Sequence, residues 1–216
     1  MNNPRKLVPE GRLQRKALAS EFYISKFRQV LMRHGLTMSI ILFFCILTPY
    51  IPTALISSIS ELFINPNKYF LLSLSVVIMM FLFLWVTSKE LNFRQLIWII
   101  YLLLISIIEE ISFRLSIPII GVNFMSDNFF WLAVFISNFC FAAIHYFTLR
   151  WKLSACVLAF LGGMGFSRLF QITEDLTLVI ILHWLLTFFN TPTAPKNNHL
   201  IPVSYTHLTL PTRFSV

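Results

Sequence analysis

The sequence predicts an all-α polytopic membrane protein, a helical bundle of about six transmembrane helices. Of its 216 residues, 57% are hydrophobic and only 12% are charged, and the mean hydropathy is +0.75. This composition is typical of chains that cross a membrane several times, and it excludes an ordinary soluble domain. The apolar residues also gather into runs long enough to span a bilayer, with short polar or basic stretches between them.

Basic residues crowd the beginning of the chain. Residues 1–34 hold eight Lys and Arg residues, and because they adjoin long apolar runs they indicate a cytoplasmic arm that obeys the positive-inside rule. We therefore expect the lipid bilayer as a partner and no nucleic acid. Within 21–34, Tyr23, Phe27, Val30 and Leu31 recur at helical spacing, which predicts an interfacial helix on an anionic membrane face. The expected location is a prokaryotic cell membrane, with the N-terminus in the cytoplasm.

Six spans are expected, at about residues 36–59, 69–87, 95–117, 128–147, 153–170 and 176–190. Pro49 and Pro52 are expected to kink the first span, and Pro118 to end the third. With the N-terminus inside, this topology leaves Lys68 outside and places most cations of the connecting segments on the cytoplasmic side, namely Lys89, Arg94, Arg150, Lys152 and Lys196. The transmembrane domain is therefore expected over 35–190, after the arm at 1–34.

The end of the chain calls for a separate interpretation. Residues 191–201 form a polar tail, and 202–216 closely resemble the in-frame translation of a transposon-end adaptor used in preparing sequencing libraries. We expect native sequence to stop near Ile201, so His207 is not a candidate site residue. The three cysteines stand isolated in apolar runs, which indicates neither a disulfide framework nor a zinc motif built from cysteines.

Three ionisable residues interrupt the third apolar run. Glu109, Glu110 and Arg114 lie in a stretch that is otherwise apolar from Leu96 to Ile120, and each costs about 3 kcal/mol to place at membrane depth. Glu110 and Arg114 are four residues apart, so they share a helix face and can pair. Glu109 lies about 100° away and has no partner nearby in the sequence. One interpretation is a paired cluster that only fixes helix packing, and the other is a carboxylate kept available for chemistry.

Two histidines on later spans strengthen the second interpretation. His145 lies near the end of the fourth span, one helical turn after Phe141, and His183 lies in the sixth. A single histidine at the end of a span is most often structural. Ionisable residues within membranes converge on the interior of the bundle, however, so two histidines and two glutamates on three spans predict a common site.

These residues carry a resemblance to a known family. Glu109-Glu110-x-x-x-Arg114, then Phe141-x-x-x-His145, then His183 on the last span, in that order, resemble the CAAX prenyl protease and bacteriocin-processing (Abi) family of intramembrane glutamate-dependent endopeptidases. The resemblance covers about 96–190. Where the family commonly has Asn or Asp four residues after the last histidine, this chain has Thr187, which lacks an amide NH2.

The resemblance implies a role for each residue. Glu109 would be the general base and His145 would orient the attacking water, while His183 and Thr187 would stabilise the oxyanion and Glu110 with Arg114 would hold the site together. We expect no cofactor, because nothing in the chain matches the His-Glu-x-x-His helix of zinc proteases. If a divalent metal such as zinc is bound, the expected ligands are Glu109, His145 and His183.

Several functions stay open at this point. The first is a membrane endopeptidase that cleaves a peptide or lipidated peptide, either a CAAX-type C-terminus or a bacteriocin leader. The alternatives are a non-catalytic scaffold or bacteriocin-immunity protein on the same fold, and a transporter that couples protons or cations through the glutamate pair. One geometric problem also remains, since straight spans would leave Glu109 about 20 Å and His145 only about 5 Å from the cytoplasmic end. Either helix tilt or shifted span boundaries must bring them together.

Overall fold

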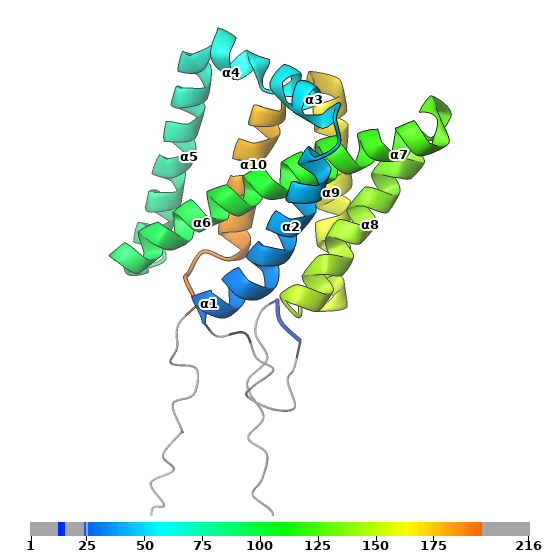
Figure 1. Cartoon of the computed structure of the whole chain (residues 1–216). Helices are drawn as coiled ribbons and strands as arrows, with labels where there is room; N and C mark the ends of the chain where they lie inside the picture. Colours follow the sequence, from blue (N-terminus) through cyan, green and yellow to red (C-terminus); the bar gives the residue numbers. More distant parts are fainter. Residues whose placement is uncertain (1–12, 16–23, 25, 196–216) are drawn as a thin grey trace, which may run out of the picture.

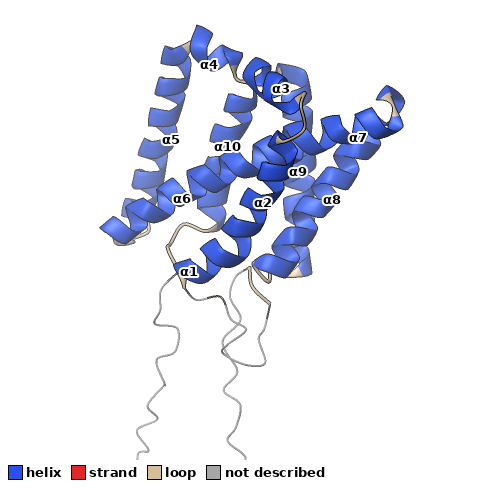
Figure 2. Ribbon diagram, in the orientation of Figure 1, coloured by secondary structure: helices blue, strands red, loops and turns tan. Residues whose placement is uncertain are grey.

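The computed structural model describes residues 13–15, 24 and 26–195, and this part of the chain is almost entirely helical (Figures 1 and 2). Five of its helices are long and apolar enough to cross a membrane: Phe27–Ile46, Pro66–Val86, Phe93–Met125, Phe130–Thr148 and Leu153–Thr173. A sixth apolar helix, Leu176–Asn190 (α10), is shorter. The predicted all-α polytopic bundle is confirmed. The polar tail from residue 196 and the adaptor-like stretch 202–216 lie outside the described residues.

The first span begins and ends earlier than the sequence suggests. Phe27–Val30 (α1), the π-helical turn Leu31–Gly35 (η2) and Leu36–Ile46 (α2) form one continuous helix, so the predicted bounds of 36–59 are wrong and the end of the basic arm belongs to the span. The helix stops before Pro49, because the residue preceding a proline avoids helical backbone angles. Pro52 lies in the first turn of Ile51–Ser58 (α3), where its missing N–H costs nothing. Helices α3 and Ser60–Ile64 (α4) then lead to Pro66–Val86 (α5) along one end of the bundle (Figure 1).

The third span is the longest helix and does not end at Pro118. Phe93–Glu110 (α6), the π-helical segment Ile111–Ser116 (η3) and Ile117–Met125 (α7) run on without a break. Pro118 lies in the first turn of α7, directly after η3 has already replaced the regular hydrogen-bond ladder. The proline therefore has no regular turn to break. The helix crosses the bundle obliquely in Figure 1. The end of α6, in the middle of this long helix, meets the end of Phe130–Thr148 (α8) where Glu109 contacts His145.

The core is built around this oblique helix. In its most apolar window 61% of the residues are buried, against 17% for Leu153–Thr173 (α9). Helix α10 packs along α6 and is fixed to it by hydrogen bonds from two indoles: Trp184 donates to the carbonyl of Ile99 (3.0 Å), and Trp98 donates to the carbonyl of Thr191 (2.8 Å). These contacts hold the last histidine-bearing helix against the glutamate-bearing one.

The basic connecting segments share one end of the molecule. The start of α1, the α5–α6 connection, the α8–α9 connection and the end of α10 all lie opposite α3 and α4 (Figure 1). These connections contain or adjoin four of the predicted cytoplasmic cations, Lys89, Arg94, Arg150 and Lys152. The four cations therefore lie at the same end of the bundle, as the charge bias predicts. Lys196 lies beyond the described part of the chain.

Candidate active site

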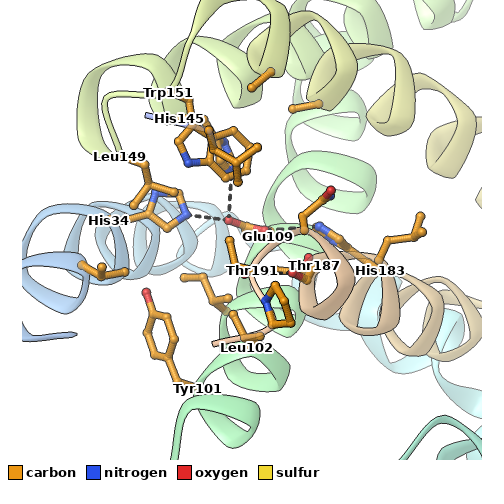
Figure 3. Close-up of a pocket in the computed structure, with 18 of the residues that line it drawn as sticks. His34, Tyr101, Leu102, Glu109, His145, Leu149, Trp151, His183, Thr187 and Thr191 are labelled. Atoms are coloured by element: carbon orange, nitrogen blue, oxygen red, sulfur yellow. Dashed lines mark hydrogen bonds and ion pairs between the residues drawn. The ribbon is translucent and has the colours of Figure 1, made fainter. Parts of the chain in front are cut away.

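Glu109 lies at the centre of a group of three histidines that come from three different helices (Figure 3). Nε2 of His34 is 2.8 Å and Nε2 of His145 is 3.7 Å from Oε1 of Glu109. Nε2 of His183 is 3.6 Å from the other oxygen, Oε2. All four side chains are buried, and Glu109 is only 2% exposed. The structure thus brings together the glutamate and both histidines that the sequence singles out.

The third histidine, His34, is absent from the sequence-based site. It lies in the π-helical turn η2, within the basic stretch interpreted as an interfacial helix. The signal that could have found it is helical spacing, since His34 continues the stripe of Phe27, Val30 and Leu31. Its ring packs edge-on against that of His145, with centroids 4.7 Å apart. A polar ring on the apolar face of a span indicates a site residue.

Hydrogen-bond directions fix which ring nitrogens carry hydrogen. The Thr148 hydroxyl donates to a backbone carbonyl one turn earlier (2.7 Å), so its oxygen accepts from Nδ1 of His34 (2.8 Å). Nδ1 of His145 lies 2.9 Å from the Phe141 carbonyl oxygen, which only accepts, so this nitrogen is also a donor. Both rings therefore turn Nε2 towards Glu109. In the neutral ring of His145, Nε2 is a free proton acceptor facing the carboxylate.

The second carboxylate is held by an ion pair. Nε of Arg114 lies 3.3 Å from Oε2 of Glu110, which confirms the predicted pairing of residues i and i+4. Nδ1 of His183 approaches Oε1 of Glu110 at 2.5 Å, so His183 stands between the two carboxylates. Both members of the ion pair are buried. A pair so far from solvent has to keep both partners, because either charge alone would be uncompensated.

The guanidinium of Arg114 is enclosed tightly. It stacks over the ring of Phe141, 4.4 Å from the centroid, and among the described residues its two Nη atoms have no hydrogen-bond partner. Helix α9 approaches it at Gly163, where an added Cβ would collide with Oδ1 of Asn138 and come within 3.2 Å of Nη2 of Arg114. Gly165, in contrast, faces open space. Of the glycine run on α9, Gly163 is therefore the residue whose small size the site needs.

The group opens onto a cavity of about 700 Å³. Glu109 and all three histidines line it, and so does Thr187, one turn beyond His183 on α10. Much of the remaining wall is apolar, with side chains such as Trp98, Leu102, Ile105, Leu149, Leu158 and Phe166. The site thus combines a buried carboxylate with a mostly apolar chamber, a combination typical of sites that bind hydrophobic ligands in one orientation.

Part of this group has the donor atoms of a metal site. His34, Glu109 and His145 each offer one ligand atom, and these atoms lie within 4.8 Å of one another. Two imidazole nitrogens and a carboxylate oxygen suit zinc and similar divalent ions. The sequence suggests Glu109, His145 and His183 as the ligand set. In the structure His34 takes the place of His183, because His183 faces the opposite oxygen of Glu109.

Residues 91–189 match the sequence model of the type II CAAX prenyl endopeptidase Rce1-like family. The resemblance to CAAX proteases is confirmed. The Rce1-like segment is a little under half of the chain, and it contains Glu109, Glu110, Arg114, His145, His183 and Thr187 but not His34. No significant match was found among curated proteins or solved structures.

Proposed function

We propose that this protein is an intramembrane endopeptidase that cleaves a membrane-proximal peptide with a water molecule activated by Glu109 and His145. The observation that carries the proposal is the position of Glu109: a buried carboxylate in the Rce1-like segment, faced by histidine nitrogens and opening onto a 700 Å³ cavity. A base in a water-poor site, beside a group that orients its water, is the arrangement that general-base hydrolysis needs.

The proposed reaction begins with a water molecule held between Glu109 and His145. A water molecule donates one hydrogen bond towards Oε1 of Glu109 and another towards Nε2 of His145, atoms that lie 3.7 Å apart. Glu109 takes a proton as the water oxygen attacks the peptide carbonyl, and the same proton then passes to the leaving amine. His183 and Thr187, on α10 beside the cavity, stabilise the oxyanion. Oxyanion donors in such sites typically contribute about 3 kcal/mol.

The family match and the cavity support a proposal for the substrate class. We propose a peptide next to a membrane, either a lipidated CAAX-type C-terminus or a bacteriocin leader, because the chamber beside Glu109 is largely apolar. Peptides with and without an isoprenoid group, offered to the purified protein in detergent, distinguish the two classes.

Glu109→Gln is the primary test. The change keeps the shape of the side chain and removes the base, so kcat should fall by about 10³-fold while thermal stability in detergent stays close to that of the wild type. The matched control is Glu174→Gln, an exposed glutamate at the C-terminal end of α9, which should cleave normally. Equal cleavage by wild type and Glu109→Gln would eliminate the glutamate mechanism. Absence of any cleavage by the wild type would instead favour the non-catalytic scaffold.

We also propose that the end of the bundle with the basic connections faces the cytoplasm. The support is the gathering of Lys89, Arg94, Arg150 and Lys152 at the end where α1 begins. A cysteine placed at Asn92, in the α5–α6 connection, should resist a membrane-impermeant thiol reagent added to intact cells. Labelling from outside would contradict this orientation.

A further inference from the structure

His34 makes the closest histidine contact with Glu109 and comes from outside the Rce1-like segment. Its Nε2 lies 2.8 Å from Oε1 of Glu109, whereas the other two histidines stand at 3.6 and 3.7 Å from the carboxylate. A separation of 2.8 Å is that of a direct hydrogen bond, in which one proton lies between the two atoms. His34 and Glu109 therefore form a bonded pair, while a gap separates Glu109 from His145.

The hydrogen bonds of His34 use both of its ring nitrogens. Nδ1 donates to the oxygen of Thr148, whose own hydrogen is directed to a backbone carbonyl. Nε2 faces Oε1 of Glu109 at 2.8 Å, and because two bare acceptors would repel each other at this distance, one proton lies between them. The ring of His34 is therefore bonded to α8 on one side and to Glu109 on the other.

The buried cluster shows why Glu109 needs such a partner. Glu109, Glu110 and Arg114 are all at 3% exposure or less. An uncompensated charge inside a membrane bundle would be costly. Arg114 lies beside Glu110, and the carboxylate that lacks an arginine is the one that His34 contacts most closely.

The side chain that precedes His34 in the sequence helps to keep its ring in place. The neighbouring Arg33 donates to the carbonyls of Phe147 and Thr148, both at 3.0 Å, and so ties η2 to the end of α8. That helix end carries both Thr148 and His145. One segment therefore fixes the groups on two sides of Glu109, and η2 is a π-helical turn of the kind found frequently at functional sites.

We propose that His34 is a positioning residue of the active site. Nε2 of His34 is hydrogen-bonded to Oε1 of Glu109, and this bond holds the carboxylate in the orientation that faces His145 and the cavity. The proposal rests on the endopeptidase function proposed above, and it adds to the Rce1-like segment a group supplied by the first transmembrane helix.

Kinetics of three variants test the proposal. His34→Ala removes the hydrogen bond to Glu109, so kcat should fall by about 10- to 100-fold with little change in KM. His34→Gln retains an N–H donor at nearly the same reach and should recover a large part of this loss. Thr148→Val, which takes away the acceptor for Nδ1, should lower kcat less than His34→Ala does. Thr37→Val, which removes a similar threonine hydroxyl one turn beyond His34, is the matched control.

Two outcomes of these experiments would overturn the proposal. Wild-type kcat in a folded His34→Ala variant would show that the contact is not needed. Equal losses in His34→Ala and His34→Gln, together with a Co²⁺ absorption band that only the wild type shows, would make His34 a metal ligand instead of a hydrogen-bond donor.

A spectroscopic readout separates this proposal from the proposed function. In NMR of the wild-type protein labelled in histidine, the proton between Nε2 of His34 and Glu109 should give a signal that is protected from exchange with solvent. Glu109→Gln should shift or remove that signal even if no peptide substrate is ever cleaved. Absence of a hydrogen-bonded Nε2 of His34 in the wild type would refute the proposal whatever the enzymatic result.

Discussion

The oblique helix α6–η3–α7 and helix α9 resemble each other in the sequence and differ in the structure. Both are apolar enough to span a membrane, yet 61% of the most apolar window is buried in the first and 17% in the second. Lipid tails are as apolar as leucine, so hydropathy does not tell a helix inside the bundle from one that faces lipid. What distinguishes the buried helix is the group of three ionisable residues in its middle part, Glu109, Glu110 and Arg114, which have to face protein.

Helix α9 approaches the buried ion pair of Glu110 and Arg114 at a glycine, which has no side chain. Its Gly163 lies against Asn138 and the guanidinium of Arg114, whereas large apolar residues such as Leu158 and Leu161 are exposed. Two helices thus contribute to one site by opposite means. The oblique helix supplies charges, and α9 supplies the space in which one of these charges fits.

The largest effect expected from breaking this arrangement comes from Arg114→Ala. Removal of the arginine leaves Glu110 as an uncompensated buried charge, so the free energy of unfolding should fall by about 3–5 kcal/mol. The double variant Arg114→Ala with Glu110→Ala should recover part of the loss. Thermal unfolding and folded yield in detergent measure both, and strictly additive losses across the double-mutant cycle would count against the pairing.

Alanine substitutions at two nearby glycines of α9 are expected to change stability less, and in opposite directions. Gly163→Ala places a methyl group against Asn138 and Arg114 and should lower the free energy of unfolding by about 1–3 kcal/mol through overpacking. Gly165→Ala faces open space, so the better helix propensity of alanine should leave stability unchanged or raise it by up to about 1 kcal/mol. Equal melting temperatures for the two variants would show that α9 does not approach the cluster as described.

The sequence by itself determined the class of the protein and the chemistry of its central helix. Long apolar runs can satisfy their backbone groups in lipid only as helices, so the all-α bundle follows from composition. The spacing of Glu110 and Arg114 fixed their pairing, because residues four apart share a helix face. The order of the motifs around Glu109, His145 and His183 was sufficient to indicate the CAAX protease family.

Only the tertiary structure decided how these groups meet. The tilt of α6–η3–α7, the uninterrupted passage through Pro118 and the early start of the first span all depend on packing between helices, which no local pattern encodes. His34 meets Glu109 across 75 positions of sequence, and its other ring nitrogen is hydrogen-bonded to Thr148 on a third helix. Helical periodicity predicts which face a residue occupies, but the partner that lies opposite that face is set by the arrangement of the whole bundle.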